Sequence, residues 1–266
     1  MQPTLEARRD YAANMIRLGL WYAHRQAQSG ADLRESVTKR SPIYRLTILW
    51  DGSRHPASGW RDERWEETLD QLYALYASSA DGADFEEEGA RILWPLAEPR
   101  VKADAEAWPW VPEGYAPVRL PDDQVFGFWA YEPPQKQDTV GFHMANPFCP
   151  ESPFSDRPAR AKELADMAAA VQARFPNVEY LATGSWLNSF PPFLEFFPED
   201  WVGAEPPSRS MGIYFGSWGQ FVARDGGFHR RNAERFRLTG EVPYPSRKGR
   251  CGISDLTEHL AARWVV

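Results

Sequence analysis

The fold is decided by residues 139–183, which read TVGFHMANPFCPESPFSDRPARAKELADMAAAVQARFPNVEYLAT. The segment from Thr139 to Met144 has the composition of a strand. A helix is expected next, because apolar residues recur at helical spacing between Asp156 and Pro176. Val178 to Thr183 predicts a second strand, which ends at Gly184. A helix of this length is enough for a crossover connection, so the two strands are expected to be parallel neighbours.

Two polar segments follow these strands, and we expect them to meet at one edge of the sheet. Ligands of open sheets bind outside the carboxyl ends of the strands. The N-terminus of the intervening helix points there as well and offers free backbone N–H groups to an anion. The residues concerned are His143, Asn146, Cys149, Glu151 and Ser152 after the first strand, and Ser185, Trp186 and Asn188 after the second. Of these, His143, Asn146, Ser185 and Asn188 are predicted to face one shared cavity.

Each of these side chains has a chemical and a structural interpretation. His143 could act as a general base at the strand end, or neighbouring backbone could satisfy its ring. Cys149 is either a thiolate nucleophile beside that histidine or a small buried hydrophobe. Ser185 would join His143 in catalysis and orient the substrate. The expected substrate contacts are Asn146, Glu151 and Asn188, with Trp186 as a wall of the pocket.

A second stretch, residues 212–221 (GIYFGSWGQF), mixes glycine with aromatic residues. From Met211 to Val222 it predicts a strand pair or one bent strand, because glycine on a strand permits close approach by a ligand or a neighbouring element. Trp218 is a candidate pocket wall and Gln220 a candidate hydrogen-bond anchor. The alternative is a twisted strand that packs on helices.

The rest of the chain predicts an α+β protein. Residues 1–95 are mainly helical, with N-caps at Thr4 and Asp62 and a short helix opened by Asp84, and they include one β-rich segment at residues 43–50. Residues 96–121 form a Pro- and Trp-rich connection. Residues 122–266 contain the sheet, with a strand at residues 125–131 and two last helices near 232–238 and 254–264. We expect a single domain of 1–266, in which the helices pack on a mixed sheet.

Composition excludes several classes of protein. The 266 residues carry a net charge of -7, which argues against nucleic acid as a partner. The chain has no apolar run long enough for a membrane span, and charged residues occupy the N-terminus where a signal peptide needs an apolar stretch. A cytoplasmic protein that binds a small molecule is therefore expected. The 12 Trp, 10 Tyr and 15 Phe predict a ring-filled core, an apolar pocket, or both.

Known catalytic and metal motifs are missing from the chain. His143, Glu151 and His229 are the residue types of a facial metal triad, but no H-x-D or H-E-x-x-H pair supports it, so no metal is expected. Gly184-Ser185-Trp186 lacks the second glycine of a nucleophile elbow. Neither a dinucleotide fingerprint nor a P-loop is present.

Residues 142–201 resemble acyltransferase-domain proteins of the GNAT type. The resemblance rests on Phe142-His143-Met144, on a long helix that ends in Phe175-Pro176, on Ser185-Trp186-Leu187-Asn188, and on Phe196-Phe197-Pro198. It implies a GNAT-like sheet and acyl transfer from acyl-CoA or an acyl carrier. The usual glycine-rich pyrophosphate loop is absent, because residues 149–154 contain no glycine and include two prolines, which lack N–H groups. The cofactor is thus left unknown.

These observations favour an enzyme that modifies a small molecule, with acyl transfer to an amine or hydroxyl as the leading reaction class. Two alternatives stay open. One is a metal- or cofactor-dependent tailoring enzyme that uses His143 and His229. The other is a non-catalytic protein that binds an apolar ligand.

Overall fold

The computed structural model describes residues 4–106, 121–134, 138–208 and 210–264, and it confirms an α+β protein. The chain divides into two compact units. Residues 119–209 and 242–266 form a sheet unit, whereas residues 2–118 and 210–241 form a helical unit. Residues 210–241 therefore leave the predicted sheet subregion and join the N-terminal helices. That the whole chain behaves as a single domain stays a prediction.

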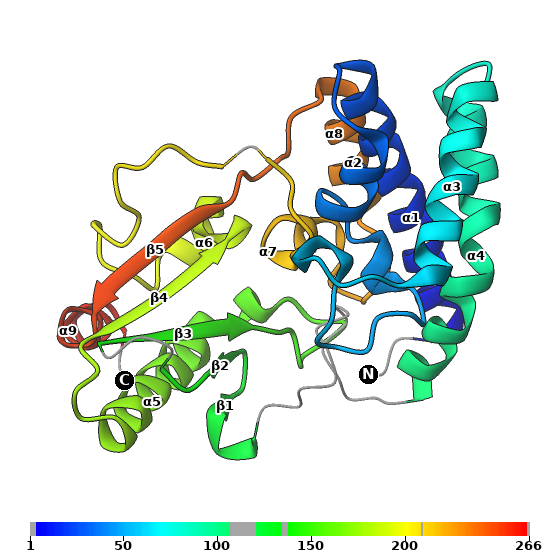
Figure 1. Ribbon diagram of the computed structural model, residues 1–266. Helices are drawn as coiled ribbons and strands as arrows, with labels where there is room; N and C mark the ends of the chain where they lie inside the picture. The colour runs from blue at the N-terminus through cyan, green and yellow to red at the C-terminus, as the bar shows by residue number, and fades with distance from the viewer. Residues whose placement is uncertain (1–3, 107–120, 135–137, 209, 265–266) are drawn as a thin grey trace. The chain divides into compact units, whose positions relative to one another are not determined.

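The helical unit is built on three long helices, α1, α3 and α4 (Figure 1). Side-chain oxygens cap α1 and α3 where the sequence predicts: Thr4 accepts from the Ala7 amide, and Asp62 accepts from the Trp65 amide. The helices are α1 (Leu5–Gln28), α2 (Leu33–Lys39), α3 (Glu63–Ser78), α4 (Gly82–Glu106), α7 (Phe215–Trp218) and α8 (Arg230–Thr239), with 3-10 turns at Ile43–Leu46, Pro56–Ser58 and Gly219–Phe221.

Three predictions for this unit are wrong. The β-rich segment at residues 43–50 is a 3-10 turn and a loop, because Thr47 folds its hydroxyl back onto the Tyr44 carbonyl (2.7 Å). Helix α4 begins after Asp81 and continues through Pro95 and Pro99, so residues 96–106 of the predicted connection are helical. Residues 107–120 of that connection lie outside the described residues. The segment from Met211 to Val222 is helical at α7 and the following turn, and Trp218 and Phe221 pack against the α8 residue Phe236.

The sheet unit contains five strands in the order β1-β2-β3-β4-β5. Only the central pair, β3 and β4, is parallel among the described strands, with Gly141 opposite Ala182. This confirms the strand–helix–strand unit predicted from residues 139–183. The strands are β1 (Val125–Phe126), β2 (Trp129–Tyr131), β3 (Thr139–Met144), β4 (Tyr180–Ser185) and β5 (Arg247–Gly252); the helices are α5 (Arg157–Arg174), α6 (Pro191–Leu194) and α9 (Ile253–Arg263), with 3-10 turns at Asp122–Gln124, Pro153–Ser155 and Trp186–Ser189.

Two features of the sheet differ from the prediction. Residues 125–131 are a tight hairpin, since Gly127 turns the chain with a φ of 58°. Strand β5 was not predicted at all, because RKGRCG is charged and glycine-rich and has little intrinsic strand preference. It forms by antiparallel pairing with β4 from Arg247 to Gly252, and glycine is needed at 249 because the Trp201 ring occupies the space of a side chain there.

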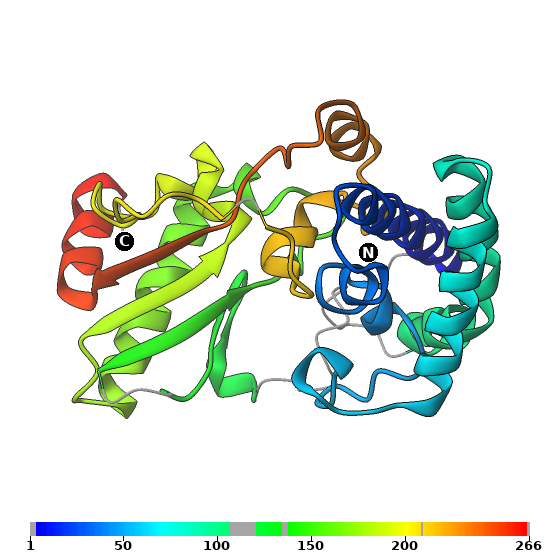
Figure 2. The ribbon, with the colours of Figure 1, turned by 45° about the horizontal axis from the view of Figure 1, so that its top comes forward.

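One face of the sheet is covered by helices (Figures 1 and 2). Alternate strand residues such as Phe142 and Leu181 point to this face and are at most 1 % exposed. They pack with Leu164 of α5 and Leu260 of α9 in one hydrophobic core. The covered face is therefore the structural side of the sheet unit.

The opposite face carries small and polar residues. By strand alternation it presents Gly141 and His143 of β3, Ala182 and Gly184 of β4, and Ala130 of β2. Gly141 and Gly184 are exposed, and a Cβ built on either would meet no atom within 4 Å. We call these five residues the glycine face.

Strands β3 and β4 diverge toward their carboxyl ends (Figures 1 and 2). Their pairing stops at Gly141 and Ala182, after which β3 continues to pair only with β2 and β4 only with β5. Backbone alternation turns the N–H and C=O of Gly184 toward the space between the two strands. The sheet therefore opens where the sequence places its polar residues.

Candidate functional site

His143 is the titratable residue of the glycine face. Its Nε2 lies 2.9 Å from Oε1 of Glu132, and both side chains are about two-fifths exposed (40 % and 41 %). Glu132 follows β2, and its backbone N–H bonds the Gly141 carbonyl, so the hairpin fixes the carboxylate beside the ring. A proton taken up by His143 would form an ion pair with this carboxylate. Nε2 itself is shielded from solvent, so a substrate on the sheet would have to exchange a proton with the other ring nitrogen, Nδ1.

Ser185 does not share a face with His143. Extending the register from Gly141 and Ala182 puts His143 level with Gly184, so the Ser185 side chain points to the covered face. It is 4 % exposed, and its Oγ accepts from the Leu187 amide at 3.2 Å. This serine caps a turn, which does not fit the role of a catalytic partner of His143.

The side chains of Asn146 and Asn188 form hydrogen bonds that stabilise the loops in which they lie. Asn188 is fully buried, and its amide donates to the carbonyls of Thr183 (3.0 Å) and Arg247 (2.8 Å) and accepts from Trp201 Nε1 (2.9 Å). Asn146 donates to the Glu151 carbonyl at 2.9 Å. Their hydrogen bonds explain the chain path at the strand ends without a ligand. The predicted convergence of four polar groups on one cavity is therefore not seen.

The other predicted contacts separate into different environments. Trp186 lies in a cluster of half-buried rings with Phe190 and Tyr244 (6.0 and 5.7 Å between centroids). Glu151 is exposed on its loop. Trp218 and Gln220 belong to the helical unit, where they are 0 % and 1 % exposed and form part of its core.

The cysteines and the second histidine have structural settings. Cys149 is buried. Burial, and next the charge of Asp200, raises the pKa of the Cys251 thiol to about 12, which makes it a poor nucleophile. His229 Nδ1 accepts from the Asn232 amide at 3.2 Å and caps α8. Among the residues that the structure describes, no three His, Cys, Asp or Glu side chains group as metal ligands.

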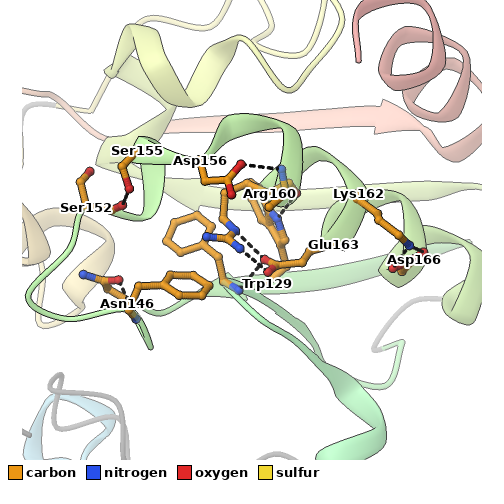
Figure 3. A network of polar contacts seen from close by, with 12 residues as sticks. Trp129, Asn146, Ser152, Ser155, Asp156, Arg160, Lys162, Glu163 and Asp166 are labelled. Carbon is orange, nitrogen blue, oxygen red and sulfur yellow. Dashed lines mark hydrogen bonds and ion pairs between the residues drawn. The ribbon is translucent and has the colours of Figure 1, made fainter. Parts of the chain in front are cut away.

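An ion pair holds the first turns of α5 against the β1–β2 hairpin (Figure 3). Arg160, which is 7 % exposed, donates from Nε to Glu163 at 2.8 Å, and Glu163 accepts from the Phe128 amide at 3.0 Å. Arg160 also lies over the Phe148 ring, and its carbonyl accepts from Trp129 Nε1. These contacts fix the loop after β3, and hence the position of the strand end that carries His143.

The start of α5 does not fit the pyrophosphate that the resemblance implies. Asp156 caps the helix with Oδ1 on the Ala159 amide (3.1 Å), which places a negative charge where a phosphate would lie. The preceding Ser152 hydroxyl already accepts from the Phe154 amide. The anion site predicted there is taken by the chain's own carboxylate.

Sequence reasoning missed Glu132 and the open glycines, although a signal for both existed. Alternation along β3 puts Val140 and Phe142 on one face and Gly141 and His143 on the other. Applied to both strands, the same rule separates His143 from Ser185.

Within the described ranges, no helix is both long enough and apolar enough to cross a bilayer. Comparison with protein families, curated proteins and solved structures gives no match for this chain.

Proposed function

We propose that the protein is an enzyme that modifies a small molecule on the glycine face, with His143 as general base. The observation that carries the proposal is the His143–Glu132 pair, which stands on an uncovered part of the sheet beside the point where β3 and β4 diverge. The His143 side chain is about two-fifths exposed (40 %), so part of the ring is open to a substrate on this face.

The arrangement suits proton removal from an amine or hydroxyl. The imidazole would take the proton as the substrate attacks, and Glu132 would stabilise the imidazolium. Backbone groups of Gly184 that face the gap can hydrogen-bond an extended, amide-bearing substrate, as an added strand does. Acyl transfer to the attacking group is the reaction class that we propose, in line with the resemblance of residues 142–201.

The acyl donor is expected to be recognised by its acyl arm, because the start of α5 rejects a phosphate. Acetyl and longer acyl groups should be offered as thioesters of coenzyme A and of N-acetylcysteamine, which lacks phosphate, with a panel of primary amines and alcohols. Thiol release is measured in each case. We expect the short thioesters to work at least as well as their coenzyme A counterparts.

His143→Gln is the test variant, and Asp166→Asn, at an exposed carboxylate of α5 in the same unit, is the control. The first should lose thiol release by about a hundredfold or more, as removal of a general base does, and the second should retain it. Activity that survives in His143→Gln would contradict the assignment. Metal analysis of the same sample tests the metal-dependent alternative, and substrate binding that persists without any turnover would favour the non-catalytic one.

A further inference from the structure

Arg247 is a half-buried cation whose side chain has no hydrogen-bond or ion-pair partner among the residues that the structure describes. It is the first residue of β5 and pairs with Ser185, the last residue of β4. Its Nε is shielded from solvent and has no hydrogen-bond acceptor, and its guanidinium forms no ion pair with any described residue. The terminal nitrogens are not enclosed in this way, so they reach solvent.

The two other arginines of the sheet unit that are described and not exposed are neutralised. Arg157 pairs with Glu195 at 2.7 Å, and Arg160 pairs with Glu163. A half-buried guanidinium without a nearby carboxylate is only partly solvated, and a carboxylate on its accessible terminal nitrogens would neutralise the charge. Arg247 is therefore a candidate for binding an external anion.

The surroundings of Arg247 add an apolar wall. Trp186 follows Ser185 directly, and Tyr244 precedes Arg247 by three residues, so both lie at this end of the β4–β5 pair. With Phe190 they form a cluster of three half-buried rings, with centroids 5.4–6.0 Å apart. A cation and partly exposed rings at the same end of a strand pair match a ligand with an acid group on an apolar body.

The charge of the site favours a carboxylate over a phosphate. Lys248 points to the opposite face by strand alternation and lies 3.5 Å from Glu205. The start of α5 is capped by Asp156. One unpaired guanidinium matches a monoanion, whereas a phosphate dianion would need further donors.

We infer that Arg247 anchors the carboxylate of a small aromatic or aliphatic acid whose apolar part packs on Trp186, Phe190 and Tyr244. The inference goes beyond the proposed function, because Arg247 pairs with Ser185 and shares its face of the sheet, opposite the glycine face. Binding is measured without turnover, so the two can fail separately.

The experiment uses calorimetric titration of the full chain with phenylacetate, indole-3-acetate and hexanoate, and with phenylacetamide as the neutral counterpart of phenylacetate. Saturable binding of at least one acid is expected, with the amide about tenfold or more weaker. Arg247→Gln should weaken acid binding about ten- to a hundredfold, and Arg247→Lys, which keeps the charge but not the planar fork, should lie between. Lys248→Gln removes the same charge one residue away and should leave binding intact.

The inference is overturned if no acid binds at about 10 mM, a concentration that would reveal even a weak site. Equal binding of the acid and the amide would overturn it too, as would equal losses of affinity in the variants at 247 and 248. So would displacement of the acids by a lower concentration of inorganic phosphate. Thermal midpoints show whether each variant is folded. If Arg247→Gln is unfolded, Arg247→Lys decides the question. His143→Gln should retain acid binding while it loses turnover, so a failure of the catalytic proposal remains distinguishable from a failure of this one.

Discussion

His55 shows how a buried residue makes stability depend on pH. It is 4 % exposed and lies against the rings of Tyr44 and Trp50. Burial, and next the charge of Arg45, lowers the pKa of His55 from 6.5 to about 4. The unfolded chain therefore binds this proton first as the pH falls. The contribution of His55 to the free energy of unfolding should be fully present above pH 6.5 and should decline by about 3 kcal/mol as the pH falls toward 4.

Denaturant unfolding at pH 7 and at pH 4.5 measures that decline, and His55→Asn is the matched control. Asparagine keeps an acceptor for the Ala57 amide, which His55 Nδ1 now binds at 3.0 Å, but it does not titrate. The variant should lose most of the difference between the two pH values. If the free energies of unfolding at pH 7 and pH 4.5 differ as much in the variant as in the wild type, other groups cause the acid sensitivity.

Asn188 is expected to act on stability, although its sequence context suggests a substrate contact. Asn188→Ala would leave Trp201 Nε1 and two backbone carbonyls without their partner inside the protein. The free energy of unfolding should fall by about 2–4 kcal/mol. Ser155→Ala, at an exposed hydroxyl of the same unit, should cost less than about 1 kcal/mol. A variant with normal stability but weakened substrate binding would restore the original interpretation.

The elements that the sequence predicts well are those with local signals. The caps at Thr4 and Asp62 and the apolar stripe of α5 are local, and the structure confirms them. Strand β5 depends on Trp201 and Gly249, which are far apart in sequence, so no local pattern reveals it. His143 lies at the strand end where it was predicted, but its face depends on which side the helices cover.

Gly127 sets the geometry of the β1–β2 hairpin and tests how tightly that element is held. A residue other than glycine would have to adopt the positive φ of this position, and its Cβ would overlap the Glu163 carboxylate, which an ion pair with Arg160 holds in place. Gly127→Ala should lower the free energy of unfolding by about 2 kcal/mol or more. Gly30→Ala, at φ 94° with no atom within 4 Å, should cost only the conformational part, about 1 kcal/mol. Equal losses in the two variants would mean that Glu163 moves aside freely.

At the scale of the whole molecule, the chain interleaves its two units. Residues 210–241 belong with the N-terminal helices, where Trp218 and Phe236 pack on Tyr22. A fragment of residues 120–266 lacks Tyr22, so the rings of Trp218 and Phe236 should be exposed in it. The fragment should therefore not unfold in a single cooperative thermal transition. Expression of this fragment beside the full chain, with calorimetry on both, measures the difference. A fragment that is as stable as the intact chain would contradict the interleaved arrangement.

The central claim is that the glycine face binds the substrate, and turnover of Gly184→Val tests it most directly. A Cβ at this position would meet no atom within 4 Å, and valine suits a strand better than glycine, so the variant should fold. We expect an unchanged or higher thermal midpoint together with thiol release that is lower by about tenfold or more, because the substrate loses its place on the sheet. A variant with wild-type turnover and a normal midpoint would show that the substrate does not bind on the glycine face.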